Sequence, residues 1–92
     1  MFIFRAWDKE GALDIRMSNR EAHLAWLKSL GEKLMLAGPS LDENGQMNGS
    51  MLVLDYDDQA ELEATLAQDP YAKAGLFVKS QISAYKAVIV NF

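Results

Sequence analysis

The stretch from Lys33 to Tyr56, KLMLAGPSLDENGQMNGSMLVLDY, decides the fold of this chain. Its two ends, KLMLAGP and SMLVLDY, are short apolar runs that predict β-strands. The segment between them is rich in turn residues, and Asn44-Gly45 is the strongest short-range signal for a hairpin. We therefore expect the two runs to pair as a hairpin, with the first strand ending at Gly38 and Pro39.

A helix is expected before this hairpin. Ser18 is a good N-cap residue, and Glu21 lies three positions later, which is the capping-box arrangement. The helix is predicted to run to about Leu30 and to stop at Gly31, because glycine is the usual residue just past a helix C-terminus. Residues 8–17 are mixed in character and contain a glycine, so they are interpreted as a loop.

A second helix and two outer strands complete the pattern. The run DDQAELEATLAQD begins with Asp57 or Asp58 as its cap and ends before Pro70, which cannot continue a helix. Residues 1–7 are rich in strand formers, and residues 76–90 predict one long strand or two segments joined by a bend. The order βαββαβ predicts a ferredoxin-like α+β fold, with an antiparallel sheet that carries both helices on one face.

Composition limits what this fold does. A length of 92 residues indicates a single domain over residues 1–92. With no cysteine and one histidine, the chain has no disulfide, no thiolate nucleophile and no metal site built from several of its own histidines. The net charge of −4, from 13 acidic and 9 basic residues without a basic cluster, argues against nucleic acid as a partner.

No apolar run approaches the roughly 20 residues of a membrane span. The N-terminus does not resemble a signal peptide, so we expect no membrane partner and a cytoplasmic location.

The strands are apolar on both faces. Within the first strand Phe2 and Phe4 point to one side and Ile3 and Trp7 to the other. In the strand after the hairpin turn, Leu52 and Leu54 likewise oppose Met51 and Val53. A face that meets water alternates polar with apolar residues, and these strands do not. Because so short a chain has little else to cover the second face, we expect a homodimer that packs sheet against sheet. The alternatives are a peripheral apolar patch or the floor of a ligand site.

The only histidine, His23, lies in the first predicted helix among bulky apolar neighbours such as Trp26 and Leu27. One interpretation is a packed structural histidine with a hydrogen-bond partner. The other is a proton-transfer group, because the unperturbed imidazole both accepts and donates protons near neutral pH.

Asp69 is the second candidate. It ends a predicted helix, where the helix dipole disfavours negative charge, and Pro70 already supplies the stop signal. Asp-Pro is also a common turn opening, so the aspartate has an ordinary explanation as well. Proximity to His23 would favour a functional role, because a carboxylate on one ring nitrogen orients the other.

Two glycine-containing segments and two arginines are weaker candidates. Gly38-Pro39 and Gly49-Ser50 lie at the same end of the predicted hairpin, interpreted as turns where a ligand approaches the backbone and the Ser50 hydroxyl. Neither matches a phosphate-binding loop.

Arg16 and Arg20 are four residues apart and are suited to clamp an anionic substrate. Solvated ion pairs with Asp14 or Glu21 are the alternative. The acidic residues between positions 55 and 63 are interpreted as a solvated face with a cap, and no metal site is predicted.

The order of these motifs resembles the YciI-like (YCII-related) family. The resemblance rests on R-x-x-H-L-x-W-L from Arg20, L-A-G-P from Leu36, G-x-x-x-G-S from Gly45 and D-P-Y-x-K-A-G-L-F from Asp69, and it spans the chain. It implies a ferredoxin-like fold that dimerises as in the dimeric α+β barrel proteins. It also implies a pocket in which the expected catalytic residues His23 and Asp69 lie together, lined by Ser50, Arg16 and Arg20. We expect these three residues to bind substrate, together with Gly38, Pro39, Gly49 and Tyr71.

The leading functional hypothesis is a small cofactor-free enzyme that acts on a small organic acid or lactone. His23 is expected to be its general acid or base, oriented by Asp69. The alternative is a non-catalytic dimeric module that binds a small metabolite or serves as an accessory subunit. A third alternative is haem ligation by His23, against which a colourless purified protein would argue.

Overall fold

The hairpin at the centre of the chain forms as predicted, in a computed structural model that describes residues 1–92. Strand β2 (Leu34–Leu41) pairs antiparallel with β3 (Met47–Leu54). Asp42 stabilises the turn by accepting hydrogen bonds from the backbone N–H groups of Asn44 and Gln46. Gly45 has φ of +78°, a conformation that glycine adopts without a steric penalty.

The prediction that Gly38 and Pro39 end the first strand is wrong. Strand β2 continues through both residues, and Gly49 and Ser50 likewise lie inside β3 rather than in a turn. Proline fits because β2 is an edge strand, where one side of the backbone has no ladder partner. Pro39 pairs with Ser50 across the ladder, so the two segments are neighbours as expected.

Helix α1 (Leu13–Ser29) begins six residues earlier than predicted. Ser18 is not its N-cap but lies within it, where its Oγ donates to the Asp14 carbonyl oxygen. The N-cap is Ala12, which makes no side-chain cap bond. Because residues 13–17 are mostly good helix formers, the helix extends back to the turn at Gly11, whose φ is +69°. The predicted stop is confirmed: Leu30 is the C-cap, and a 3₁₀ turn (Gly31–Lys33) follows.

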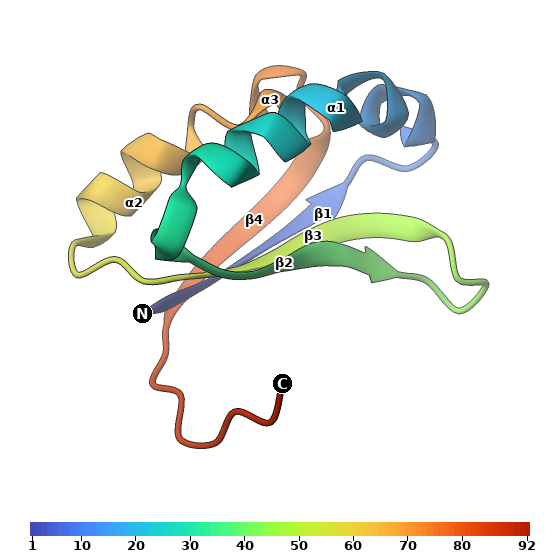
Figure 1. The fold of residues 1–92 in the computed structure, drawn as a ribbon. Helices are drawn as coiled ribbons and strands as arrows, with labels where there is room; N and C mark the ends of the chain where they lie inside the picture. Colours follow the sequence, from blue (N-terminus) through green and yellow to red (C-terminus); the bar gives the residue numbers. More distant parts are fainter.

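The remaining elements give the expected topology (Figure 1). Strand β1 (Phe2–Asp8) lies between β3 and β4 (Phe77–Ala84), and the sheet order is β2-β3-β1-β4 with antiparallel pairs throughout. Helix α2 (Gln59–Leu66) is capped by the Asp58 side chain. A one-turn helix that the sequence did not predict, α3 (Pro70–Lys73), follows it. The last strand stops at Ala84, earlier than expected, and residues 85–92 have no regular structure.

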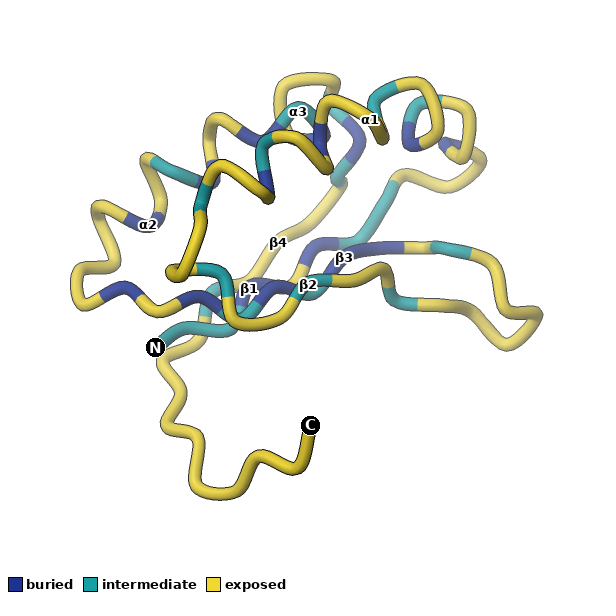
Figure 2. The backbone as a smooth tube through the Cα atoms, in the orientation of Figure 1, coloured by how far each residue is buried: buried dark blue, intermediate teal, exposed yellow.

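The helices lie on one face of the sheet, and the core lies between the two layers (Figures 1 and 2). Phe4, Leu52 and Leu54 of the sheet pack against Leu27 of α1 and Leu62 of α2. Each of these side chains is buried, and Leu54 and Leu62 are fully enclosed. No helix is both long enough and apolar enough to span a bilayer.

The opposite face of the sheet is apolar in part, as the sequence predicts. Ile3, Met51 and Val53 are only partly covered. With residues of the C-terminal segment they line a groove of about 460 Å³, in which eleven of twelve lining residues are hydrophobic. Figure 1 shows this segment on the side of the sheet away from the helices.

Candidate active site

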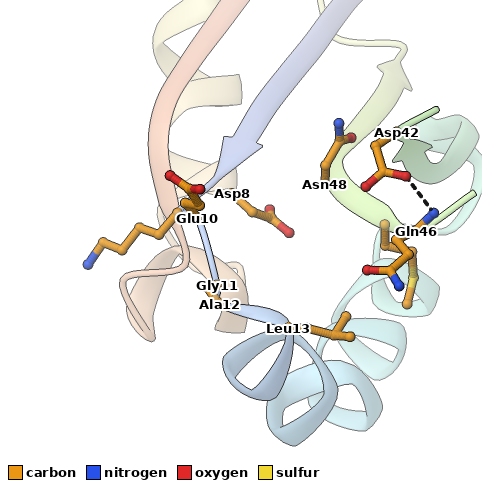
Figure 3. A pocket seen from close by; sticks show the side chains of 10 residues that line it. Asp8, Glu10, Gly11, Ala12, Leu13, Asp42, Gln46 and Asn48 are labelled. Atoms are coloured by element: carbon orange, nitrogen blue, oxygen red, sulfur yellow. Dashed lines mark hydrogen bonds between the residues drawn. The ribbon is translucent and has the colours of Figure 1, made fainter. Parts of the chain in front are cut away.

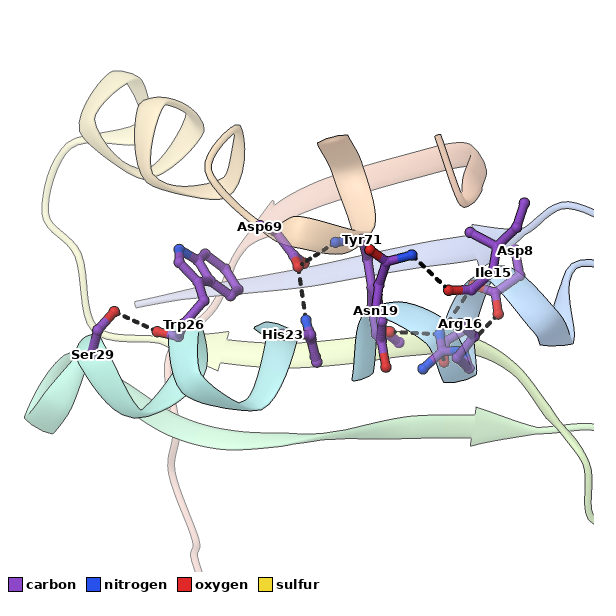
Figure 4. Close-up of polar contacts among 11 residues, drawn as sticks. Asp8, Ile15, Arg16, Asn19, His23, Trp26, Ser29, Asp69 and Tyr71 are labelled. Carbon is purple, nitrogen blue, oxygen red and sulfur yellow. Dashed lines mark hydrogen bonds and ion pairs between the residues drawn. The ribbon is translucent and has the colours of Figure 1, made fainter. Parts of the chain in front are cut away.

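His23 and Asp69 lie in direct contact although 46 residues separate them in the sequence (Figure 4). The distance from His23 Nδ1 to Asp69 Oδ1 is 2.7 Å. Both residues are buried, with exposures of 6% and 1%. The contact forms because α1 presents His23 toward α3, which packs beside it.

The short helix α3 positions Asp69. The sequence suggested that Asp69 closes a helix, but it is the N-cap of α3, with Pro70 at the first helical position. Its Oδ1 accepts a hydrogen bond from the Tyr71 backbone N–H at 2.9 Å. Its Oδ2 is enclosed and has no hydrogen-bond partner. A buried acceptor without a hydrogen bond lowers the free energy of unfolding by about 1–3 kcal/mol, so stability alone does not explain the aspartate at this position.

Two aromatic rings surround the imidazole. Tyr71 stacks on His23 with 3.8 Å between ring centroids and 11° between the planes, and Trp26 lies 5.9 Å away. Tyr71 is itself 1% exposed. Burial raises the pKa of its phenol above the ordinary 10.0, and the charges of Arg16 and Arg20 oppose this rise. The phenol is therefore neutral at physiological pH.

Arg16 occupies the other end of the site. Its Nε donates to Asp8 Oδ2 at 2.7 Å, and its Nη2 donates to Asp8 Oδ1 at 3.0 Å, to the Gly49 carbonyl at 2.8 Å and to Ser50 Oγ at 2.9 Å. The guanidinium carbon also lies 4.7 Å from the Tyr71 ring centroid. The expected alternative of a solvated pair with Asp14 or Glu21 is wrong for Arg16, because its carboxylate partner is Asp8 and both side chains are buried.

Asp8 is a site residue that the sequence analysis missed. It ends β1, and nothing in its neighbours marks it as the partner of an arginine eight residues later. Charge balance is the only usable signal, because a buried arginine requires a carboxylate and Asp8 is the acid nearest to the first strand.

Of the other expected site residues, Gly49 belongs to this cluster through its carbonyl oxygen, whereas Arg20 and Gly38 form no hydrogen bond or ion pair with it. Arg20 is exposed and forms no ion pair within the chain. Gly38 is exposed and pairs with Met51, which belongs to the sheet face away from the helices. Gly49 has a packing role: a Cβ there would overlap the Ala6 carbonyl oxygen and come within 2.7 Å of Ser40 Oγ.

A cavity of about 230 Å³ lies at the Asp8 end of the site (Figure 3). Its walls come from residues 8–13, which join β1 to α1, and from Asp42 and residues 46–48 of the hairpin. Neither this cavity nor the groove on the other face of the sheet is lined by His23 or Asp69. No group of three or more His, Cys, Asp or Glu side chains is arranged to hold a metal ion.

The geometry fixes which imidazole nitrogen is available for chemistry. An ionised carboxylate only accepts hydrogen bonds, so Nδ1 of His23 carries the proton in the bond to Asp69. In the neutral ring, Nε2 is then the nitrogen with the free lone pair. Nε2 has no hydrogen-bond partner in the chain and is not fully enclosed, although the side chain as a whole is only 8% exposed; we call this nitrogen open in that sense. A buried His–Asp pair with one open nitrogen is able to accept and return a proton.

The fold and this pair define a class of protein: a ferredoxin-like α+β domain of the dimeric α+β barrel type, with a buried histidine–aspartate pair where α1 and α3 meet. Within that class the chain belongs to the YCII-related domain family, which matches residues 1–86.

Two proteins are similar in sequence over nearly the whole chain, and one solved structure is similar in both sequence and fold. Protein YciI of Escherichia coli O6:H1 is 30% identical, and the match covers 96% of this chain and 98% of that protein. An uncharacterized protein of Haemophilus influenzae is 32% identical over 95% of this chain and 97% of its own length. A similar solved structure is the 5-chloro-2-hydroxyhydroquinone dehydrochlorinase TftG of Burkholderia phenoliruptrix, in complex with 2,5-dihydroxybenzoquinone. It is 32% identical over 92% of each chain, with a TM-score of 0.85.

Proposed function

We propose that this chain is a small enzyme that uses His23 and Asp69 for acid–base chemistry without a cofactor. The observation that carries the proposal is the buried 2.7 Å bond from Nδ1 to Asp69, which leaves Nε2 open. In the reaction Nε2 accepts a proton from the substrate and later returns it. The carboxylate stabilises the imidazolium in between and keeps the ring in one orientation.

The proposed substrate class is a small oxygen-rich organic molecule: an organic acid, a lactone or a hydroxylated ring. The first two fit a proton-transfer enzyme that holds a carboxylate with an arginine. The third is suggested by TftG, whose name and bound quinone describe dehydrochlorination of a hydroxylated ring. Arg20 is exposed and unpaired, so it is the arginine we propose to bind the anionic end of the substrate. Ser50 accepts from Arg16 and keeps its own O–H proton to donate to developing negative charge.

The experiment is a substrate screen with three matched variants. Purified protein is incubated with small acids, lactones, hydroquinones and their chlorinated forms, and conversion is followed by NMR. His23→Gln and Asp69→Asn should each lower kcat/KM by about 10²- to 10⁴-fold, the usual contribution of a positioned acid–base group. Asp57→Asn is the control for Asp69→Asn, because Asp57 is exposed and forms no ion pair.

Two results would count against the enzyme. Unchanged turnover in His23→Gln would show that the imidazole takes no part in the reaction. A compound that raises the melting temperature and is recovered chemically intact would favour the alternative, a metabolite-binding module.

We also propose that the chain is a homodimer packed through the free sheet face. The support is the exposed apolar surface there. Leu36 of β2 is 37% exposed, and it lines the groove of about 460 Å³ with Val53 and the C-terminal segment. Apolar surface gathered in one patch on a small domain is characteristic of an interface.

A matched pair of variants tests the dimer. Leu36→Glu places a charge on the free sheet face, whereas Leu24→Glu places one on α1 at a leucine that is also 37% exposed. Analytical ultracentrifugation should give a dimer for wild type and Leu24→Glu and a monomer for Leu36→Glu. A monomeric wild-type protein at the highest concentration tested would refute the proposed dimer.

A further inference from the structure

Tyr71 contacts both members of the His23–Asp69 pair. Its ring lies flat on the imidazole, with centroids 3.8 Å apart. Its backbone N–H donates to Asp69 Oδ1, the same oxygen that accepts from His23 Nδ1. One residue therefore touches the imidazole with its side chain and the carboxylate with its backbone.

The Tyr71 ring is held from its other sides as well. Arg16 lies 4.7 Å from the ring centroid, and Phe77 meets the ring edge-on at 6.2 Å and 88°. Arg16 and His23 are seven residues apart, which is two turns of α1, so both face α3. The phenol ring lies between them along the helix (Figure 4).

Arg16 cannot swing away from this stack without losing other bonds. Its guanidinium donates to both oxygens of Asp8, to the Gly49 carbonyl and to Ser50. These partners lie at the end of β1 and in β3, so the sheet holds Arg16 and Arg16 holds one side of the Tyr71 ring. An unbroken series of contacts therefore connects the sheet, through Arg16 and Tyr71, to the imidazole.

We propose that Tyr71 is a positioning residue: clamped between Arg16 and the imidazole, its ring holds His23 in the orientation where Nδ1–H meets Asp69 and Nε2 stays open. Tyr71 is 1% exposed, so a ligand reaches little of its surface, and its role is support rather than substrate contact. The catalytic value of this support rests on the proposed function, but the orientation and tautomer of His23 do not require a substrate.

The first test is NMR of the single imidazole, which no other histidine obscures. In the wild type, the carbon-bound ring protons of His23 should resonate upfield of their random-coil positions, because a stacked phenol shields them. The ¹⁵N shifts should report one tautomer with the proton on Nδ1. Tyr71→Phe keeps the ring and should keep both signatures. Tyr71→Leu removes the ring and should lose the upfield shift and give a mixture of tautomers.

Each result decides the proposal. A wild type without the upfield shift overturns it whether or not any variant folds, because the stack is then absent. A single Nδ1–H tautomer that persists in Tyr71→Leu also overturns it, because Asp69 alone would then hold the ring. If Tyr71→Leu does not fold, Tyr71→Met fills more of the space and is read in the same way.

Kinetics separate positioning from substrate binding once a substrate is known. Tyr71→Leu should lower kcat by as much as about 100-fold with little change in KM, as expected when a reacting group is misplaced. A raised KM with unchanged kcat would mean that Tyr71 contacts the substrate. An unsuccessful substrate screen would weaken the proposed enzyme and leave the NMR result on Tyr71 intact, so the two failures are distinguishable.

Discussion

Replacing Arg16 by methionine tests whether this buried guanidinium stabilises the fold or is available to bind a ligand. Arg16→Met keeps most of the side-chain length but removes four hydrogen bonds, two of them to Asp8. Asp8 would then keep a carboxylate with a side chain only 7% exposed and no cation beside it. Removing one partner of a buried ion pair costs about 3–5 kcal/mol, mostly because the other charge is left unpaired.

That loss is large for a domain of this size. Stabilities of roughly 0.05–0.15 kcal/mol per residue give about 5–14 kcal/mol for the whole chain, so the variant should fold but unfold at much lower urea concentration. Urea unfolding followed by circular dichroism at fixed protein concentration measures the change. Arg20→Met is the control, because Arg20 is exposed and unpaired, and it should change stability by no more than about 0.5 kcal/mol.

The double variant isolates the pair. Asp8→Asn with Arg16→Met removes both charges, so Asp8→Asn should destabilise the Arg16→Met background less than it destabilises the wild type, by about 1–3 kcal/mol, the coupling expected between contacting residues. The reasoning is refuted if Arg16→Met costs as little as Arg20→Met. It is also refuted if Asp8→Asn destabilises the two backgrounds equally.

Three further predictions concern packing and pH. Gly49→Ala should cost about 1–3 kcal/mol in urea unfolding because its Cβ overlaps the Ala6 carbonyl, whereas Gly38→Ala, with nothing within 4 Å, should be nearly neutral; equal effects would refute the overlap. Leu62→Ala should cost about 2–5 kcal/mol by the same assay, since Leu62 is fully enclosed, and a loss below about 1 kcal/mol would contradict the assigned core. Tyr71→Phe should flatten the alkaline loss of stability. Burial raises the pKa of Tyr71 above 10.0, so above pH 10 the unfolded chain releases the phenolic proton first, and wild-type stability falls as pH rises. Urea unfolding from pH 8 to about pH 11 should show that the wild type loses more stability than Tyr71→Phe. Equal losses in the two proteins would contradict the raised pKa of Tyr71.

The sequence predicted element types better than their ends. The hairpin turn at Asn44-Gly45 and the helix stop at Gly31 were correct, because these signals are local and depend on backbone conformations that glycine favours. The start of α1 was wrong because a good cap, Ser18, does not begin a helix when the residues before it are also helix formers. Strand β2 runs through Pro39 because it is an edge strand, and edge position depends on strand order in the whole sheet.

The candidate site was also predicted only in part. His23 and Asp69 were identifiable as unusual residues, and the resemblance to a family linked them. No local pattern gives a contact across 46 residues. Asp8 was missed as the partner of Arg16, and the stacking of Tyr71, an expected substrate-binding residue, on the imidazole was not predicted. These contacts arise where α1, α3 and the sheet meet.

By itself the sequence determined the βαββαβ order, the apolar character of both sheet faces and the identity of the one imidazole. These features depend on composition and on residues that are close together in the chain. Only the tertiary structure decided which nitrogen of His23 stays open, that Asp69 caps a one-turn helix and leaves Oδ2 unpartnered, and that Arg16 is tied to Asp8. The reason is physical: hydrogen-bond partners and burial are properties of packed neighbours, and packing joins residues that the chain keeps far apart.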